Sequence, residues 1–368
     1  MPAEGDTSRK PLWALGLMSG TSLDGVDAAL LRTDGATLAE PGPWLTAPYD
    51  EATRGLLRSA LSGEAIGEAE RALTEAHAVA LRDLLRRAGK TSNDVAVVGF
   101  PGHTLLHEPE AGITWQIGDG ARLAELIGID VVSDFRRRDV AAGGQGAPFA
   151  PLYHRALAHG LERPLAVLNI GGVANVTWIG ADDRLIAFDT GPGCAPIDDW
   201  VLGLTGEPRD EGGALARRGT PDAERLAELK GDGYFARPPP KSLDRNAFDR
   251  GLVEGLSAAD GAATLCAFTA WAAGQASRHF PAPPKRWLVT GGGRHNLALM
   301  EALRRELPEA EVLPVEEVGW AGDALEAQAF AFLAVRSLRG LPLSLPETTG
   351  VGAPVTGGAL HRQATRKD

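Results

Sequence analysis

The sequence predicts an α/β protein of two domains. A chain of 368 residues is too long for one typical core and indicates two domains of ordinary size. Three glycine-rich turns each follow a strand-like apolar run, and the predicted strands of the second half repeat the order of the first. Ligands gather at the strand ends of such sheets, where glycine lets the backbone approach them closely.

The first glycine-rich turn lies between the apolar runs 12–17 and 26–31. Its backbone N–H groups and the hydroxyls of Ser19, Thr21 and Ser22 suit a phosphate chain. Asp24 suits a hydrated Mg²⁺ beside that chain. An ordinary polar hairpin loop explains one such turn equally well, so the phosphate hypothesis depends on the other two.

The second turn, Gly171-Gly172, follows the apolar run 165–170, and the third, Gly291-Gly292-Gly293, follows 286–290. None of the three turns has the G-x-x-x-x-G-K-[ST] pattern or the G-x-G-x-x-G spacing. The predicted phosphate site is therefore of another type.

The predicted elements of the first half alternate strands with helices. Strands are expected at 12–18, 26–33, 95–99, 113–117 and 130–133, and helices at 65–88 and 121–127. The glycine-rich stretch 143–148 breaks this pattern and marks the expected crossing into the second domain. The predicted lobes are 1–145 and 146–368.

The second half repeats this order without repeating the sequence. Strands are expected at 165–172, 174–179, 184–189 and 286–290, and a helix at 321–338 that ends before Gly340. Three consecutive prolines, 238–240, predict an extended loop that could lie across a cleft.

The composition excludes several classes of function. A formal net charge of −11 argues against a nucleic-acid surface, which needs clustered Lys and Arg. The two cysteines predict no disulfide framework. Because no signal-like apolar region or stretch of 18 apolar residues occurs, we expect a cytoplasmic protein without membrane contact.

Three further features have competing interpretations. Asp189 ends an apolar run before a Gly/Pro turn and suits a general base, although spacing alone favours a turn-capping role. His103 and His107 have a metal-ligand spacing, but flanking prolines leave no room for a helix and no third ligand is near. Cys194 follows a Gly-Pro-Gly turn, where a small buried residue is favoured over a low-pKa thiol.

The chain resembles the anhydro-N-acetylmuramic acid kinases, a family within the superfamily of acetate and sugar kinases, Hsp70 and actin. The segments that carry the resemblance keep the family's order and are GLMSGTSLDGVDAAL (16–30), QIGDGARLAELIGIDVVSDFRRRDVAAGGQGAP (116–148), LNIGGVANVTW (168–178), FDTGPG (188–193), VTGGGRHNLALMEAL (289–303) and the helix around Glu326.

The resemblance implies a duplicated actin-like, ribonuclease H-like fold with an ATP cleft between the lobes. It implies an enzyme of cell-wall (peptidoglycan) recycling, expected to be a homodimer, that converts 1,6-anhydro-N-acetylmuramic acid and ATP to N-acetylmuramic acid 6-phosphate and ADP. Asp189 matches the catalytic base, which would activate water to attack the anomeric carbon while O6 takes the γ-phosphoryl group.

The resemblance also implies the binding residues. ATP, with Mg²⁺ at Asp24, would bind at Gly20, Thr21, Ser22, Leu23, Asp24, Gly25, Val26, Asp27, Gly171, Gly172, Gly291, Gly292, Gly293 and Asn296. The sugar would meet Glu326, Gln145 and one arginine of the run 136–138, with Arg138 as the candidate; arginine can bind a carboxylate through two hydrogen bonds. Ion pairs with Asp134 and Asp139 would account for at least one of the three arginines.

Two departures from the family pattern leave the exact sugar open. The chain has Phe100-Pro101-Gly102-His103-Thr104 where the family usually has Ser/Phe-His-Gly-Gln-Thr, and Cys194 where it has Asn. A kinase for a simpler 1,6-anhydro sugar such as levoglucosan is therefore one alternative. A nucleotide-driven binding clamp of the Hsp70 or actin type is another.

Overall fold

The computed structural model describes residues 10–20, 23–245, 247, 248 and 250–363. The chain divides into two compact units, unit 1 with residues 1–160 and 324–368 and unit 2 with residues 161–323. This division differs from the predicted boundary between 145 and 146. Helix α5 (Pro151–Leu157) still contacts elements of unit 1, and α10 (Leu325–Leu338) returns to it, so the glycine-rich stretch 143–148 interrupts the pattern without ending the domain.

Unit 1 contains a six-stranded sheet in the order β13-β7-β4-β1-β2-β3. Strands β1, β2 and β3 are antiparallel neighbours, β4 is parallel to β1, β7 is parallel to β4, and β13 pairs antiparallel with β7. The bounds are β1 Leu12–Met18, β2 Gly25–Thr33, β3 Ala39–Pro48, β4 Val97–Gly99, β7 Val131–Ser133 and β13 Ala359–His361, with the separate hairpin β5 His103–Glu108 and β6 Ile113–Ile117.

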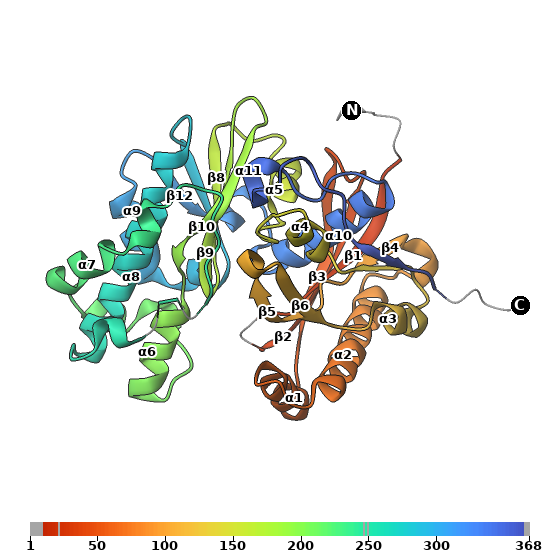
Figure 1. Ribbon diagram of the computed structural model, residues 1–368, viewed down its shortest axis with the longest axis horizontal. Coiled ribbons are helices and arrows are strands. Elements are labelled where there is room, and N and C mark those ends of the chain that lie inside the picture. The colour runs from red at the N-terminus through yellow and green to blue at the C-terminus, as the bar shows by residue number, and fades with distance from the viewer. Residues whose placement is uncertain (1–9, 21–22, 246, 249, 364–368) are drawn as a thin grey trace, which may run out of the picture. The chain divides into compact units, whose positions relative to one another are not determined.

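The two faces of this sheet are covered by different helices (Figure 1). Leu15 and Leu17 of β1 share a core with α2, whereas Gly16 between them faces α10. A Cβ at Gly16 would lie 1.8 Å from the Ala327 carbonyl oxygen, and one at Gly99 of β4 would lie 2.1 Å from the Phe330 oxygen. These glycines therefore let α10 approach the sheet. The other helices of unit 1 are α1 Glu51–Leu61, α2 Ile66–Arg87, α3 Gly120–Ile127, α4 Arg137–Ala141, α5 and α11 Pro346–Thr349.

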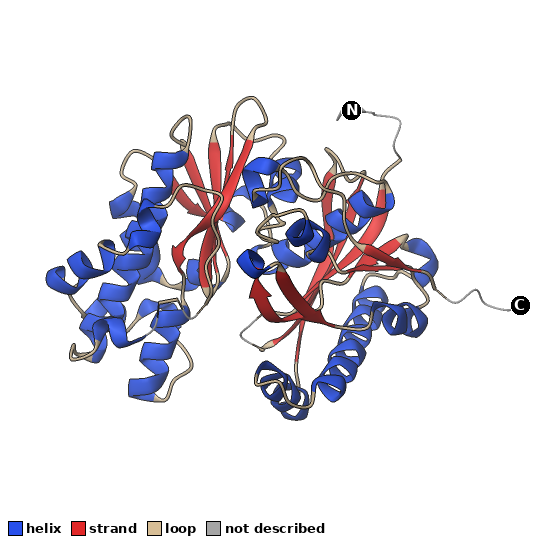
Figure 2. Ribbon diagram, viewed as in Figure 1, coloured by secondary structure: helices blue, strands red, loops and turns tan. Residues whose placement is uncertain are grey.

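Unit 2 contains a five-stranded sheet in the order β10-β9-β8-β11-β12. Strands β8, β9 and β10 are antiparallel neighbours, β11 is parallel to β8, and β12 is parallel to β11. Helices α8 and α9 pack together over this sheet (Figure 2). The bounds are β8 Leu165–Ile170, β9 Val173–Ile179, β10 Leu185–Pro192, β11 Arg286–Thr290, β12 Glu311–Pro314, α6 Ala195–Thr205, α7 Ala223–Lys230, α8 Ala258–Gln275 and α9 Leu297–Glu306.

The two sheets share one strand order, which confirms the predicted duplication. The series β3-β2-β1-β4-β7 in unit 1 and β10-β9-β8-β11-β12 in unit 2 match strand by strand in order and direction. This is the duplicated, two-unit α/β topology of the actin-like fold.

Most predicted strands are confirmed, but the sequence prediction missed β3, β5, β12 and β13. Strand β3 contains Pro41, Gly42 and Pro43, which argue against a strand by propensity. It lies at the edge of the sheet, where proline is tolerated because fewer ladder hydrogen bonds are needed. The other three strands are short, partly exposed segments without a clear apolar run.

Candidate active site

The predicted phosphate loop is the connection between β1 and β2 in unit 1. Thr21 and Ser22 lie outside the described residues. The loop is tied to Tyr49, whose hydroxyl donates to the Ser19 Oγ at 2.8 Å and whose N–H donates to the Asp24 carbonyl at 3.1 Å. Leu23 has a φ of 57° and donates its N–H to the Gly20 carbonyl at 3.1 Å. Tyr49 thus anchors the loop on both sides, at Ser19 and at Asp24.

The residues that end this loop have different local roles. A Cβ at Gly25 would lie 2.3 Å from the Ala47 carbonyl oxygen, so the pairing of β2 with β3 already requires this glycine. Val26 is buried, which leaves only its backbone for a ligand. Asp27 is half-buried and accepts a hydrogen bond from the Thr46 hydroxyl at 2.5 Å, whereas Asp24 is exposed. Asp24 therefore presents its carboxylate to solvent.

The segment 100–104, which departs from the family pattern, places the buried side chain of His103 near the backbone of Ser19 in this loop. His103 is 1 % exposed, and neither ring nitrogen makes a hydrogen bond of normal geometry to a described residue. Burial lowers the pKa of His103, an effect that the nearby Ser19 backbone opposes. Burial also lowers the pKa of His77, which packs on Phe100, to about 4. Both rings are therefore neutral at physiological pH.

The structure places His103 and His107 on strand β5, not on a helix. His107 contacts the Thr114 hydroxyl at 2.9 Å and the Gln145 carbonyl at 2.9 Å. Within the described ranges, no group of three or more His, Cys, Asp or Glu side chains is arranged to hold a metal.

The arginines of the run 136–138 point to different partners. Arg136 is half-buried and donates to the Gly146 carbonyl at 2.7 Å. Arg137 is exposed and pairs with Asp134 at 3.4 Å, as expected for at least one of the three. Arg138 is exposed and donates to the Thr356 hydroxyl at 3.2 Å, while the Gln145 N–H donates to the Thr349 carbonyl at 2.6 Å.

In unit 2 the two remaining glycine-rich turns come together at the ends of β8 and β11. A Cβ at Gly291 would lie 2.5 Å from the Ile170 carbonyl oxygen, and one at Gly293 would lie 2.5 Å from the Ile170 side chain. The Gly171 carbonyl accepts the N–H of Cys194 at 2.7 Å. Gly171 and Gly172 face more open space, with no other atom closer than 3.6 Å to an added Cβ.

The side chain of Arg294, which is 6 % exposed, stabilises the third turn. Its guanidinium donates to the Gly291 carbonyl at 2.9 Å and to the carboxylates of Glu316 at 2.9 Å and Asp323 at 2.7 Å. Asn296 caps helix α9 by accepting the Leu299 N–H at 3.0 Å. Asn296 therefore has a structural role as the N-cap of α9, in addition to the nucleotide-binding role that the sequence predicts.

Asp189 lies on the buried strand β10 and is 8 % exposed. The register of β10 against β9 shifts between Asp189 and Gly191. Its Oδ2 accepts the N–H of Leu243 at 2.8 Å, its own N–H donates to the Lys241 carbonyl at 3.1 Å, and its carbonyl accepts the Tyr234 hydroxyl at 2.5 Å. The carboxylate is therefore held rigidly, as a general base requires.

The model of the family "Anhydro-N-acetylmuramic acid kinase" matches residues 12–363. The chain belongs to this family. Three relatives of that name are similar to this chain over nearly their whole length. The relative from Rhodospirillum rubrum is 59 % identical to this chain, and the match covers 96 % of this chain and 95 % of the relative. The relative from Paramagnetospirillum magneticum is 58 % identical, with 95 % and 99 % covered, and that from Rhizorhabdus wittichii is 53 % identical, with 95 % and 98 % covered.

This membership makes the protein a kinase, and a kinase of such a family uses ATP as its phosphoryl donor. The kinase has no helix, within the part of the chain that the structure describes, that is long and apolar enough to cross a bilayer.

The surroundings of Glu326 and Cys194 differ, because one side chain is exposed and the other is mostly enclosed. Glu326 is exposed in the first turn of α10, a helix of unit 1. Burial, followed by the nearby Asp198, raises the pKa of the Cys194 thiol to about 12. A reactive low-pKa thiol at Cys194 is therefore excluded.

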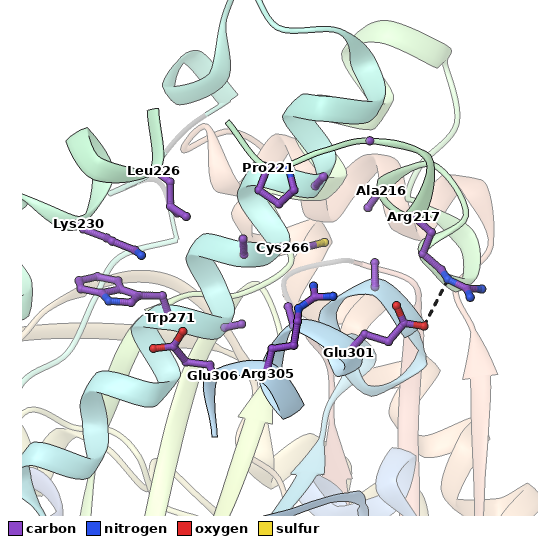
Figure 3. A pocket seen from close by; sticks show the side chains of 16 residues that line it. Ala216, Arg217, Pro221, Leu226, Lys230, Cys266, Trp271, Glu301, Arg305 and Glu306 are labelled. Carbon is purple, nitrogen blue, oxygen red and sulfur yellow. Dashed lines mark ion pairs between the residues drawn. The ribbon is translucent and has the colours of Figure 1, made fainter. Parts of the chain in front are cut away.

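The kinase also has a pocket of about 590 Å³ within unit 2 that the sequence did not reveal (Figure 3). Trp271, Pro221 and Leu226 form apolar walls, and the ion pair of Arg217 with Glu301 at 3.4 Å lies at one end. Alanines of helices α8 and α9 also line the pocket. Small residues at helical spacing signal close packing as readily as a cavity, so no sequence pattern marked this pocket. The alanines are Ala263, Ala267, Ala270, Ala298 and Ala302.

Cys266 connects the pocket to the predicted nucleotide turn. It lines the pocket, and its Sγ accepts a hydrogen bond from the Asn296 Nδ2 at 3.9 Å. Asn296 in turn donates its N–H to the Gly293 carbonyl at 3.1 Å. One layer of side chains thus separates the pocket from the turn Gly291–Gly293.

Proposed function

We propose that the kinase opens 1,6-anhydro-N-acetylmuramic acid with water and transfers the γ-phosphoryl group of ATP to O6, giving N-acetylmuramic acid 6-phosphate and ADP. The observation that supports this most directly is the fixed, buried carboxylate of Asp189 in a chain that belongs to the anhydro-N-acetylmuramic acid kinases. The relatives named above carry the same activity in their names.

The reaction balances with Asp189 as its single base. Asp189 takes a proton from water as the water oxygen bonds to the anomeric carbon, and the bond from that carbon to O6 breaks. O6 takes the γ-phosphoryl group, and the bond from the γ-phosphorus to the bridging oxygen breaks to release ADP. Asp189 then gives its proton to solvent. The phosphoryl step itself needs mainly positioning and charge neutralisation.

Backbone groups of the Gly20–Asp27 loop and of the Gly171-Gly172 turn would bind the phosphates of ATP. The absence of any contact closer than 3.6 Å to a Cβ built at Gly171 or Gly172 supports this assignment, because packing does not require a glycine at either position. The exposed carboxylate of Asp24 has the oxygen ligands that Mg²⁺ prefers and would hold that ion through water. Bound Mg²⁺ would offset part of the phosphate charge.

The pocket on α8 and α9 would take the nucleoside end of ATP. Its volume of about 590 Å³ lies within the usual range for small-molecule sites, Trp271 offers a planar apolar surface to a base, and the charged side chains of Lys230, Arg305 and Glu306 also line it. Its connection through Cys266 and Asn296 to the turn Gly291–Gly293 supports the assignment. Ala302→Trp, which would fill the pocket, should raise the KM for ATP and leave the KM for the sugar unchanged. Equal KM values for ATP in this variant and the wild type would exclude this site.

The sugar would be recognised by Arg138, Gln145 and Glu326. Arg138 is exposed, and the neutral Thr356 hydroxyl to which its guanidinium donates at 3.2 Å is a weak partner that it can exchange for the lactyl carboxylate. We further propose that the kinase acts in the cytoplasm in peptidoglycan recycling, and that it is a homodimer.

A coupled ADP-release assay over several sugars tests the reaction. We expect turnover with 1,6-anhydro-N-acetylmuramic acid and little with levoglucosan, which lacks the lactyl and acetamido groups. Preference for levoglucosan would assign the kinase to a simpler anhydro sugar. ADP release that no sugar stimulates would indicate a nucleotide-driven clamp and contradict the proposal.

A further inference from the structure

Lys241 is a buried lysine that the reaction proposed above does not use. Only 4 % of it is exposed. Its ammonium donates to the Tyr234 carbonyl at 3.1 Å, and lies 4.4 Å from the centre of the Tyr234 ring and 5.8 Å from that of Phe188. Burying a lysine is costly unless its charge is compensated. Its position therefore calls for a reason beyond packing.

The same part of the chain surrounds the proposed base. Residues 234–243 hold Asp189 at three points: the Tyr234 hydroxyl, the Lys241 carbonyl and the Leu243 N–H. Because the Lys241 ammonium binds the Tyr234 carbonyl, it links the beginning of this segment to its end. The ammonium thus closes the loop of contacts that fixes Asp189.

Charge connects the same two residues. Burial, followed by the nearby Arg237, lowers the pKa of Lys241 to about 8, and Asp189 opposes that effect. The other titratable groups at this place are Tyr234, whose pKa is raised by burial and then by Asp189, and His279, whose pKa is lowered by burial and then by Lys241. Asp189 is therefore the group among these that favours the charged form of Lys241.

We propose that Lys241 is a positioning residue for catalysis: it holds the segment 234–243 against Asp189 and keeps that carboxylate oriented and ionised for the attacking water. The inference rests on the proposed function, since it assumes that Asp189 is the base. A lysine with a purely structural role would contribute to stability alone.

Lys241→Met removes the charge and keeps most of the side-chain volume. We expect kcat to fall roughly 10- to 100-fold, the range for a catalytic group that is slightly misplaced, with little change in the KM for ATP or sugar. The acid limb of the pH profile of kcat/KM should move to higher pH, because Asp189 loses a neighbouring positive charge. Lys241→Arg keeps that charge and should leave the acid limb in place.

Lys285→Met is the matched control, since Lys285 is exposed in the same unit and pairs with Glu162 at 2.5 Å. It should retain wild-type kcat. Thermal unfolding of each variant should show that the fold is intact. A loss of stability in Lys241→Met with unchanged kcat, or an unmoved acid limb, would overturn the inference.

The double variant with Asp189→Asn separates the inference from the proposed function. If Lys241 acts through Asp189, Lys241→Met should lower the remaining turnover of Asp189→Asn by less than twofold. A full 10- to 100-fold loss in that background would show that Lys241 acts elsewhere and would overturn the inference. The Asp189→Asn variant alone tests the base: near wild-type turnover in it would refute the proposed function, whatever Lys241→Met does.

Discussion

The two units share one strand order but differ in the burial of equivalent strands. In unit 1, β3 is a proline-containing edge strand that is mostly exposed, whereas its equivalent in unit 2, β10, is buried throughout and carries Asp189. The first hairpin also differs: unit 1 has a polar loop with Ser19 and Asp24, and unit 2 has the short turn Gly171-Gly172. One topology thus supplies a loop suited to phosphate and metal in one unit and a rigid base in the other.

The centres of the two sheets differ as well. Gly16 and Gly99 are register partners in unit 1 and leave room for α10, whereas the corresponding strands of unit 2 pair large apolar residues such as Val167 with Leu288. Gly16 and Gly99 in unit 1 therefore serve packing. In unit 2, Gly171 and Gly172 after β8 would accept a Cβ without a close contact, whereas Gly291 and Gly293 after β11 pack tightly against Ile170.

The largest expected effect is on the base in unit 2. Asp189→Asn keeps the shape of the side chain but cannot take a proton, so turnover should fall by roughly 10²–10⁴-fold. Binding of ATP and sugar, measured by calorimetry, should change far less because the loss falls on the transition state. Asp27→Asn is a carboxylate control in unit 1, and it should affect ATP binding more than the chemical step. A stronger loss of kcat from Asp27→Asn than from Asp189→Asn would reverse the assignment of roles.

The next effect concerns the centre of the unit 1 sheet. Gly16→Ala places a methyl group 1.8 Å from the Ala327 carbonyl oxygen, so α10 must shift. We expect a loss of about 1–3 kcal/mol or more in the free energy of unfolding, as for an overpacked core. Gly55→Ala is the control, because Gly55 lies in helix α1 with open space around it and should gain about 0.5–1 kcal/mol. Urea unfolding of both variants checks the pair, and equal stabilities would contradict the account.

Acid should weaken unit 1 before unit 2. His77 and His154 are buried in unit 1, and burial lowers the pKa of His77 to about 4 and that of His154 to about 3. Because the unfolded chain binds a proton near pH 6.5 and the folded one does not, stability falls as pH falls from about 6.5 toward 4. At pH 5 each ring should cost about 2 kcal/mol. Hydrogen exchange at pH 7 and pH 5 should show the larger loss of protection in unit 1. A larger loss in unit 2 would contradict the prediction that the buried histidines destabilise unit 1 as the pH falls.

The smallest expected effect is on the KM for ATP, after a substitution in the Gly171-Gly172 turn of unit 2. Gly172→Ala adds a methyl group with no neighbour closer than 3.6 Å, so the fold should be unchanged. If ATP phosphates approach this backbone, the KM for ATP should rise by roughly tenfold, about the effect of one lost hydrogen bond to a charged group. Gly160→Ala, another glycine with open space, should leave the KM for ATP unchanged. An unaltered KM in Gly172→Ala would move the phosphates away from this turn.

Much of this comparison could be predicted from the sequence, and the physical reasons for the rest are specific. The apolar runs at β1, β8, β10 and β11 predicted their strands because each is a short, nearly continuous apolar segment that the sheet buries. Strand β3 was missed because an edge position tolerates the prolines that propensity penalises. The return of α10 to unit 1 depends on Gly16 and Gly99, which lie far from it in the sequence and show no pattern until the sheet is formed.

The candidate site was predictable to a similar extent. The second and third glycine-rich turns stand at strand ends that the apolar runs define, whereas Asp189, expected at the end of a strand, lies within β10, which continues to Pro192. Tyr234 and Lys241 were missed because they lie in irregular chain around the prolines 238–240, where no periodicity indicates which side chain is buried. Only the packing of that segment against β10 reveals their contacts with Asp189.

The central claim is that water activated by Asp189 opens the sugar while ATP phosphorylates O6. Reaction in ¹⁸O-water, followed by mass spectrometry before the anomeric oxygen exchanges with solvent, tests it most directly. The account predicts one ¹⁸O atom on the anomeric carbon of the 6-phosphorylated sugar and none in its phosphate. Label found only in inorganic phosphate would show plain hydrolysis of ATP and would contradict the claim.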